Sequence, residues 1–184
     1  MAAEKVQHIA EALEHAVTSS GQRLVDLSRT SPVLLVFLRH AGCTFCREAL
    51  WDLAAQRRAI DAVGTKIVIV HMGDSESIEA LLVKYKITDV ERICDPEQRL
   101  YRAFGLKEGT VWQLFGPKVL WRALGEGVLR RHGIAWAAAD SAQMPGLFLL
   151  DGSELVRRFR HRSAADRSDY QSLCTSKARA AGER

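Results

Sequence analysis

The chain has 184 residues, of which 47% are hydrophobic and 26% charged, and its formal net charge is +4. A chain of this length and balance can bury a core as one globular domain without disulfide or metal crosslinks. The sequence has no run of about 18 apolar residues that could span a membrane, and its first residues do not resemble an apolar leader. We therefore expect a cytoplasmic protein without a membrane partner.

Positive charge gathers toward the C-terminal end, at Arg157, Arg158 and Arg160, and around Arg130 and Arg131. A basic cluster of this kind can bind nucleic acid, but the sequence contains no helix-turn-helix, zinc-finger or aromatic stacking pattern. We expect these side chains to form a solvated face or an anion site, and nucleic acid is not an expected partner.

The first two-thirds of the chain alternates between helical and strand patterns. Apolar residues at helical spacing predict a helix over 3–17, and a continuous apolar run predicts a buried strand over 33–38. The elements expected after it are, in order, a helix beginning at a cysteine pair, a strand over 66–71, a helix after Asp74 and Ser75, a short strand over 91–94, and a helix through Leu100, Tyr101 and Phe104 that ends at Gly105. This alternation is typical of α/β architecture with a largely parallel sheet.

The last third of the chain has a different pattern. Residues 106–143 predict an inserted amphipathic helix that packs over the sheet edge or beside the active site. Residues 147–150, the turn signal Asp151–Gly152 and residues 154–161 predict a β-hairpin, which would make the sheet mixed. We expect residues 1–184 to form a single domain with a core over about 24–172 and a frayed end after 177.

Two closely spaced cysteines, Cys43 and Cys46, follow the first buried strand at the start of the expected helix. The first amides of a helix lack intrahelical acceptors, and the helix dipole favours negative charge there. A thiolate at this place is stabilised, so we expect the pKa of the thiol to fall below its usual value of about 8.5. Arg39, His40 and Arg47 are expected to add positive charge nearby.

The position of each cysteine predicts its role in a dithiol–disulfide exchanger. Cys43, nearer the helix N-terminus and less covered, should attack, and Cys46, one turn deeper, should resolve the mixed disulfide. In a peroxide-reducing enzyme these roles could reverse. Two other interpretations stay open: half of a zinc site, for which the sequence offers no second close pair, and two cysteines that pack as small hydrophobes.

Four segments of the sequence resemble the peroxiredoxin-like, AhpC/TSA-like branch of the thioredoxin-fold superfamily: Phe37–Glu48, Cys94–Leu106, Gln113–Lys118 and His161–Tyr170. The resemblance implies a thioredoxin-like α/β fold, with a mixed central sheet flanked by helices, and thiol redox chemistry at Cys43 and Cys46. It implies no cofactor and no metal ion. It further implies a peroxide or protein disulfide as substrate and a thioredoxin- or glutathione-type electron donor, and it leaves room for a homodimer.

The resemblance also assigns residues around the cysteine pair. In a thioredoxin-type fold, the strand facing the CxxC motif is preceded by a cis-proline loop. Met144–Pro145 has this place before 147–150, so its peptide bond is expected to be cis and to face a substrate backbone. Arg39, His40 and Thr44 are expected to bind substrate or tune the thiols; His40 could equally cap the strand.

The chain departs from true peroxiredoxins in and around the motif: no proline precedes it at the usual place, and Met144–Pro145 replaces an arginine-bearing loop. Those enzymes carry a threonine three residues before the peroxidatic cysteine, and here Cys43 stands at that place when Cys46 is the peroxidatic counterpart. We therefore expect a more thioredoxin-like pocket. Cys94 and Cys174 are expected to be structural or incidental, with a resolving role as the alternative.

The leading hypothesis is a thiol–disulfide oxidoreductase or peroxiredoxin-like antioxidant enzyme that cycles Cys43 and Cys46. The rival hypothesis is a non-catalytic thioredoxin-fold interaction module. Such a module would dock a partner through the 106–143 helix or the basic hairpin.

Overall fold

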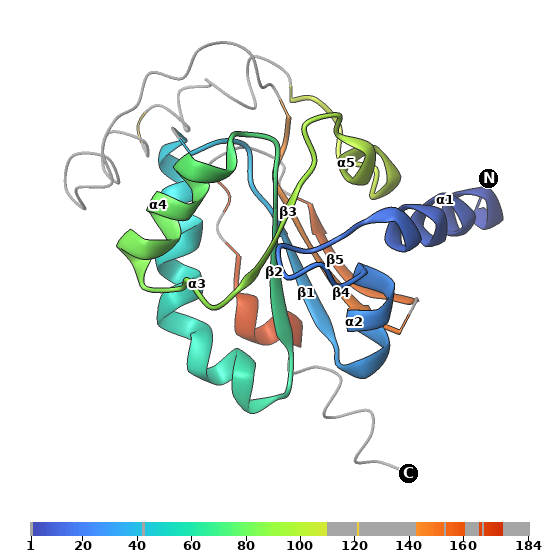
Figure 1. The fold of residues 1–184 in the computed structure, drawn as a ribbon, viewed down its shortest axis with the longest axis horizontal. Coiled ribbons are helices and arrows are strands. Elements are labelled where there is room, and N and C mark those ends of the chain that lie inside the picture. Colours follow the sequence, from blue (N-terminus) through green and yellow to red (C-terminus); the bar gives the residue numbers. More distant parts are fainter. Residues whose placement is uncertain are drawn as a thin grey trace.

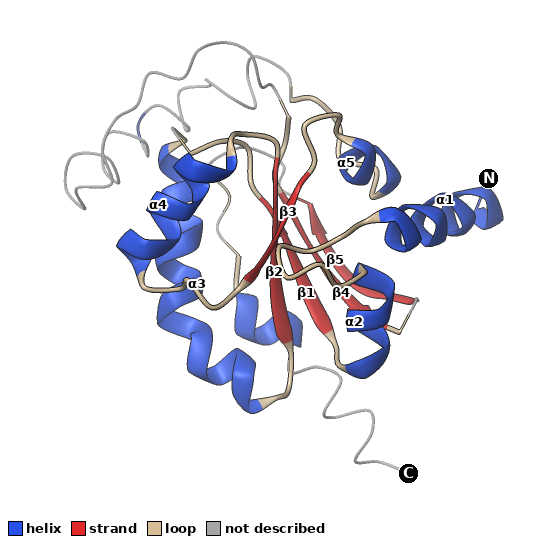
Figure 2. Ribbon diagram, viewed as in Figure 1, coloured by secondary structure: helices blue, strands red, loops and turns tan. Residues whose placement is uncertain are grey.

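The computed structural model describes residues 2–41, 43–109, 121, 143–152, 154–160, 166 and 168–174 (Figure 1). Its helices are α1 (Ala2–His15), α2 (Leu24–Thr30), α3 (Thr44–Ala62), α4 (Ser75–Tyr85) and α5 (Arg99–Ala103). Its strands are β1 (Val33–Phe37), β2 (Lys66–His71), β3 (Glu91–Cys94), β4 (Gly146–Asp151) and β5 (Glu154–Arg160). The expected α/β fold, with a mixed sheet flanked by helices, is confirmed (Figure 2).

The sheet has five strands in the order β3-β2-β1-β4-β5. β1 pairs parallel to β2 and antiparallel to β4, β2 pairs parallel to β3, and β4 pairs antiparallel to β5. β1 and β2 take inner positions because their continuous apolar runs can be buried on both faces. The carboxyl ends of β1, β2 and β3 therefore meet at one edge of the sheet, and the loop after β1 carries the cysteine pair.

Helices cover both faces of the sheet, with α3 and α4 on one face and α1, α2 and α5 on the other (Figure 1). Alternate side chains of β1 enter two separate cores, as the two-residue period of a strand requires. Leu34 and Val36 belong to the core under α3, which also contains Leu50. Leu35 and Phe37 belong to the core under α1, α2 and α5.

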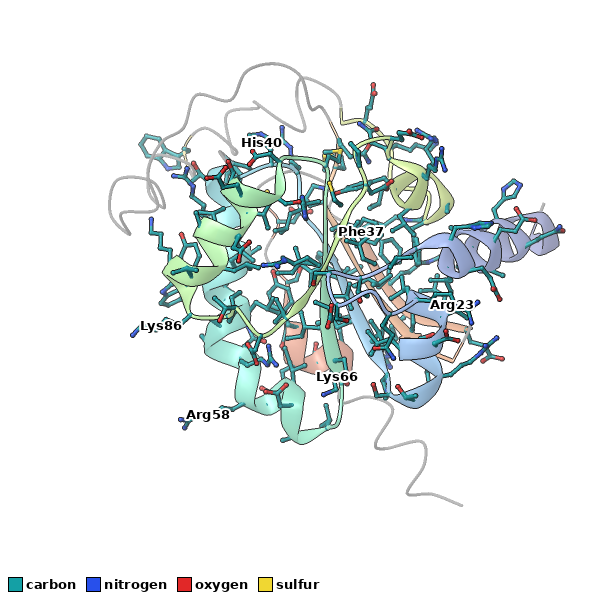
Figure 3. All side chains as sticks on the ribbon, in the orientation of Figure 1. Arg23, Phe37, His40, Arg58, Lys66 and Lys86 are labelled. Atoms are coloured by element: carbon teal, nitrogen blue, oxygen red, sulfur yellow. The ribbon has the colours of Figure 1, made fainter. Side chains whose placement is uncertain are left out.

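Aromatic packing around Phe37 holds α5 against the carboxyl end of β1. The ring centroid of Phe37 lies 4.9 Å from that of Tyr101, 5.3 Å from Phe104 and 5.4 Å from Phe148. Figure 3 shows Phe37 among the interior side chains, whereas Arg58 projects outward. This cluster fixes the Tyr101 side chain beneath the loop that follows β1.

The predicted helix cap at Asp74 is confirmed, and the predicted hairpin is confirmed with a shifted connection. Asp74 is the N-cap of α4, and its carboxylate accepts a hydrogen bond from the amide of Ser77 at 2.7 Å. The hairpin of β4 and β5 forms, but its connection lies one residue later than expected, because Asp151 itself pairs with Glu154. Gly152 follows the paired Asp151 with φ of +60°, a backbone conformation that glycine adopts without strain.

The N-terminal region differs from the expectation in two ways. α1 ends at His15 rather than near residue 17, because Val17 turns away to form an isolated antiparallel bridge with Arg23. α2 then begins at Leu24, where the sequence patterns predict no helix. Its buried residues include Leu24, Val25 and Leu27, so it adds apolar cover over the sheet.

Some predictions fall largely outside the described residues. These are the inserted helix over 106–143 and the frayed end after 177, and they stay predictions. Among the described helices, none is both long enough and apolar enough to cross a membrane.

Candidate active site

The two cysteines lie at the start of α3, at the carboxyl edge of the sheet. Cys43 is the N-cap residue of α3, and Cys46 lies in the first turn. The amide of Cys43 donates to the carbonyl oxygen of His40 at 3.1 Å, which closes the loop between β1 and α3. Both thiols are free and buried, with Cys43 6% exposed and Cys46 3% exposed. The expected order of exposure is right, but the difference is small.

Several donors converge on the sulfur of Cys43 and lower its pKa to about 6. The largest cause is a hydrogen bond from the Cys46 thiol; the charge of Arg39 and the backbone amides of Cys46 and Phe45 act in the same direction, against the effect of burial. Nη1 of Arg39 lies 3.9 Å from Sγ of Cys43. Near neutral pH, Cys43 is therefore a thiolate held at a helix N-terminus, as its position in the sequence predicts.

Cys46 has the opposite tendency. Burial raises its pKa well above the usual range, and the adjacent Cys43 sulfur, as hydrogen-bond partner and as charge, raises it further. The amide of Arg39 donates a hydrogen bond to Sγ of Cys46 at 3.2 Å, and this contact favours the thiolate. The pair thus holds one proton, which is bound to the Cys46 sulfur and hydrogen-bonded to the Cys43 sulfur.

His40 does not supply the positive charge that its position in the sequence suggests. Burial lowers its pKa, and the neighbouring charges of Arg39 and Arg47 lower it further. The imidazole is therefore neutral near pH 7. His40 instead contacts Cys43 through its backbone carbonyl, which accepts the Cys43 amide. Arg47 stabilises the same loop, because its Nε donates to the carbonyl of Ala41 at 3.0 Å.

The structure brings Pro145 to the cysteine pair. Pro145, Cys43 and Cys46 line one small cavity with a volume of about 30 Å³. Thr44, the first residue of α3, is buried beside them, and Met144 is buried at the start of the segment that leads into β4.

The expectation of a cis bond at Met144–Pro145 is wrong, because the described residues contain no cis peptide bond. The preceding residue, Gln143, forms an antiparallel bridge with Glu108, and the amide of Met144 donates to the carbonyl of Lys107 at 3.1 Å. This pairing leads the chain in an extended path from Gln143 into β4, a path that a trans bond continues.

Three carboxylates line the same cavity, and reasoning from the sequence did not find them. Glu48 and Asp52 on α3 are each 4% exposed, and Asp166 lies in the C-terminal segment. Phe45, Glu48 and Asp52 have the spacing of one helix face, which is the signal that could have indicated a shared surface. Charged residues on a helix normally face water, so the burial of Glu48 and Asp52 depends on tertiary packing that the helix pattern does not reveal.

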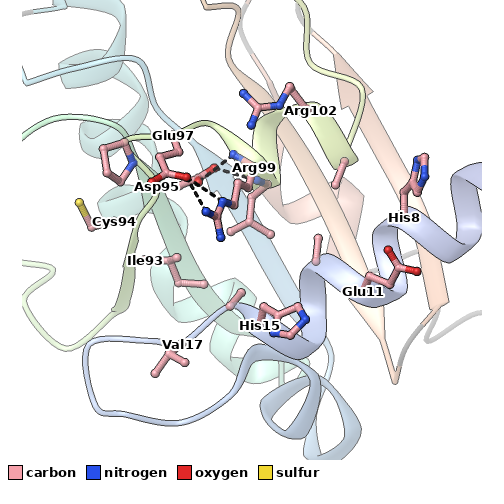
Figure 4. A pocket seen from close by; sticks show the side chains of 15 residues that line it. His8, Glu11, His15, Val17, Ile93, Cys94, Asp95, Glu97, Arg99 and Arg102 are labelled. Carbon is pink, nitrogen blue, oxygen red and sulfur yellow. Dashed lines mark hydrogen bonds and ion pairs between the residues drawn. The ribbon is translucent and has the colours of Figure 1, made fainter.

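Cys94 and Cys174 are not part of this cavity. Cys94 is exposed at the end of β3 and borders a larger cavity of about 720 Å³ between α1 and the β3–α5 region, with His8 and His15 on its α1 side (Figure 4). Cys174 is buried in the C-terminal segment, and burial raises its pKa to about 11. In the described ranges, no three His, Cys, Asp or Glu side chains gather closely enough to hold a metal ion.

Known proteins resemble this chain in sequence. The sequence profile of the family described as AhpC/TSA antioxidant enzyme matches residues 52–164. The prostamide/prostaglandin F synthase of Pongo abelii is 30% identical over 148 residues, which are 78% of this chain and 69% of that protein. The chloroplastic thioredoxin-like protein AAED1 of Arabidopsis thaliana is 28% identical over 99 residues, which are 54% of this chain but only 39% of that protein.

A solved structure supports the same relationship at the level of the fold. The bacterioferritin comigratory protein of Xanthomonas campestris superposes with a TM-score of 0.62 at 15% identity, covering 94% of this chain and 96% of that one. The sequence profile covers more than half of the chain, and the Pongo abelii enzyme aligns over more than two-thirds of its own length. The chain therefore belongs to the AhpC/TSA antioxidant enzyme family and has the thioredoxin-like fold.

Proposed function

We propose that the protein is a thiol–disulfide oxidoreductase that cycles Cys43 and Cys46 between a dithiol and an intramolecular disulfide. The observation that carries this proposal is the placement of both sulfurs in one small cavity at the N-terminus of α3, with Nη1 of Arg39 3.9 Å from Sγ of Cys43. These surroundings lower the pKa of Cys43 to about 6 and raise that of Cys46. A thiolate is the attacking form in disulfide exchange, and a neighbouring thiol is needed to release the product.

With a disulfide substrate, the cycle has two displacement steps. The Cys43 thiolate attacks one substrate sulfur, the substrate S–S bond breaks, and the first product leaves as a thiolate that takes up a proton. Cys46 then loses its proton and attacks the Cys43 sulfur, which expels the second product thiolate. The substrate gains two electrons and two protons, one released by Cys46 and one taken from solvent, and the enzyme retains a Cys43–Cys46 disulfide.

With a peroxide substrate, Cys43 would attack an oxygen atom, break the O–O bond and become a sulfenic acid, while water or an alcohol leaves. Cys46 would condense with the sulfenic acid and release water. Either route needs a thioredoxin- or glutathione-type thiol to reduce the disulfide again. We propose a reducing compartment, the cytoplasm, as the place of the cycle because it supplies such donors.

The residues around the pair fit these steps. Arg39 and the first amides of α3 favour negative charge on Cys43, which helps the sulfur both as nucleophile and as leaving group. Pro145 borders the cavity beside both sulfurs, where a substrate would approach. Met144 and Thr44 are proposed to shape that approach.

The test is a turnover assay run side by side with hydrogen peroxide, an organic hydroperoxide, a protein disulfide and a prostaglandin-type substrate, the last because of the name of the Pongo abelii relative. Thioredoxin and glutathione systems are each supplied as donor. We expect Cys43→Ser to abolish turnover and Cys46→Ser to accumulate a mixed disulfide or a sulfenic acid on Cys43.

Cys94→Ser is the matched control, because Cys94 is an exposed thiol away from the small cavity, and it should retain turnover. A folded Cys43→Ser protein that turns over every accepted substrate at the wild-type rate would refute the proposal. A Cys43 pKa at the ordinary value, in a pair that never oxidises, would instead favour the non-catalytic interaction module.

A further inference from the structure

One peptide group connects the side chain of Tyr101 to the sulfur of Cys46. The hydroxyl of Tyr101 donates a hydrogen bond to the carbonyl of Leu38. The amide of the next residue, Arg39, donates to Sγ of Cys46 at 3.2 Å. The accepting carbonyl and the donating amide belong to the same Leu38–Arg39 peptide bond, so a hydroxyl, a peptide and a thiol form one continuous chain of hydrogen bonds.

Tyr101 is held firmly at one end of this chain. Its side chain is fully buried, and its ring meets that of Phe37 edge to face at 4.9 Å between centroids. The hydroxyl also lies 3.1 Å from the carbonyl oxygen of Val70, which already accepts the amide of Leu38 at 2.9 Å. Burial raises the pKa of Tyr101 well above its usual value, with Cys46 among the further causes, so the hydroxyl keeps its proton and remains a donor.

A peptide group transmits polarisation because its C=O and N–H share a conjugated system. A donor on the carbonyl draws electron density from the nitrogen, and the N–H becomes a stronger donor; chains of hydrogen bonds reinforce each other in this way inside proteins. We propose that Tyr101 is a positioning residue of the redox site, which strengthens the hydrogen bond from the Arg39 amide to Cys46 and so stabilises the Cys46 thiolate.

The need for such a donor follows from the surroundings of Cys46. Among the described residues, the charged and titratable groups around it are Cys43, Glu48 and Asp52 on α3, Arg39 in the preceding loop, Tyr101 on α5, and Asp166 and Tyr170 in the C-terminal segment. Of these described groups, Arg39 alone is a cation, and three acidic side chains share the cavity in which the second negative charge would form. In the proposed function, Cys46 must lose its proton before it attacks the Cys43 sulfur. A polarised Arg39 amide would therefore speed that step, a kinetic consequence that rests on the proposed function.

The experiment measures Cys46 in the reduced Cys43→Ser protein, where no coupled thiolate complicates the titration. Carbon-13 NMR of the Cys46 side chain gives its pKa, and the proton shift of the Arg39 amide reports the strength of its hydrogen bond. We expect Tyr101→Phe to raise the pKa of Cys46 by about 0.2 to 0.6 pH units and to move the amide resonance upfield. In the otherwise wild-type protein, release of the second product should slow by about two- to fourfold, the same shift converted to a rate.

Phe104→Leu is the control for a general loss of packing, because Phe104 is a buried neighbour on the same segment that also contacts Phe37. It should lower stability without moving the pKa of Cys46 or the Arg39 amide shift. A folded Tyr101→Phe protein with both readouts unchanged, or changed only as much as in Phe104→Leu, would overturn the proposal.

A second variant covers the case in which Tyr101→Phe does not fold. Replacing Tyr101 with a tyrosine fluorinated beside the hydroxyl keeps the ring and makes the phenol a stronger donor, so the pKa of Cys46 should fall instead of rise. An unchanged or raised pKa in that variant would also overturn the proposal. Both readouts use reduced protein without substrate, so they are independent of whether Cys43→Ser abolishes turnover, the result that decides the proposed function.

Discussion

The guanidinium of Arg39 lies against the thiol of Cys43 inside the loop between β1 and α3, with Nη1 3.9 Å from Sγ. Arg39 is only 7% exposed, so water screens its charge weakly. After the hydrogen bond from Cys46, this charge is a principal cause of the lowered pKa of Cys43. The backbone amide of Arg39 donates a hydrogen bond to Sγ of Cys46, so Arg39 acts on both thiols through different groups.

Replacing Arg39 with methionine removes the charge and keeps an apolar side chain of similar length. In the wild-type protein, Cys43 is a thiolate above its pKa of about 6 and is protonated below it. We expect Arg39→Met to raise the pKa of Cys43 by about 1 pH unit, so that alkylation at pH 6 to 7 slows. The measurement is the rate of iodoacetamide labelling against pH, in a Cys94→Ser background that removes the exposed thiol.

Arg57→Met is the matched control for the loss of one positive charge at a place distant from the cysteine pair. Arg57 pairs with Asp61 at 2.8 Å and Asp89 at 2.9 Å at the far end of α3. The midpoint for Cys43 should stay unchanged in this variant. If the pH midpoint of labelling in Arg39→Met equals that of the wild-type protein, the role assigned to the guanidinium is contradicted.

The buried carboxylate of Asp95 anchors the start of α5. It accepts hydrogen bonds from the amide of Arg99 at 2.9 Å and from that of Leu100 at 2.8 Å. Asp95→Ala would leave these amides without their acceptor, and we expect a loss of about 1 to 3 kcal/mol in the free energy of unfolding, measured by urea denaturation. Asp74→Ala, which removes an exposed cap from α4, is the comparison and should cost about 1 kcal/mol. Equal losses would show that burial of Asp95 adds nothing.

Gly146, at the start of β4, has no room for a side chain. An added Cβ would lie 2.7 Å from Cδ2 of Leu106 and 3.1 Å from Cε2 of Phe148. We expect Gly146→Ala to lower the free energy of unfolding by about 1 to 3 kcal/mol because the core must repack around the methyl group. In a Leu106→Ala background the nearest atom is gone, so most of that loss should disappear. Additive losses in the double variant would rule out this contact as the cause.

Cys174 is expected to be chemically inert. It is buried, and burial raises its pKa to about 11, against a hydrogen bond with Thr65. Iodoacetamide at pH 8 should label Cys43 and the exposed Cys94 in the native protein and reach Cys174 only in denaturant, as peptide mass spectrometry would show. Cys174→Ala should leave turnover unchanged. A large loss of turnover with normal stability would instead support the resolving role left open for this thiol.

The sequence predicts elements best where burial on both faces leaves a distinct pattern. β1 has five consecutive buried apolar residues, and α3 begins within the cysteine pair, with Cys43 as its N-cap, so both could be placed from local signals. α2 has only seven residues, too few for a helical period to stand out. Its existence depends on the apolar surface it covers, which other parts of the chain create.

The site shows the same limit. The cysteine pair and Arg39 are neighbours in sequence, so their approach could be predicted from the strand–loop–helix pattern. Tyr101 could be recognised only as an apolar-face residue, because the acceptors of its hydroxyl are carbonyls of Leu38 and Val70, which only the parallel sheet brings together. The buried Glu48 could not be told from a surface residue, since its burial depends on tertiary packing that the local sequence does not show.

The position of β1 in the sheet has a consequence for how the chain is made. One edge of β1 pairs with β2, which follows it in the chain after a single helix. The other edge can pair only when β4 has been synthesised, since Phe37 pairs with Gly146. Contacts between residues so distant in sequence form late, because the long stretch of chain between them must first bring its ends together. Until β4 leaves the ribosome, an entirely apolar strand presents unpaired backbone groups along that edge. A nascent chain that has passed β3 but not yet reached β4 is thus the form most prone to self-association, and the form on which a chaperone would act.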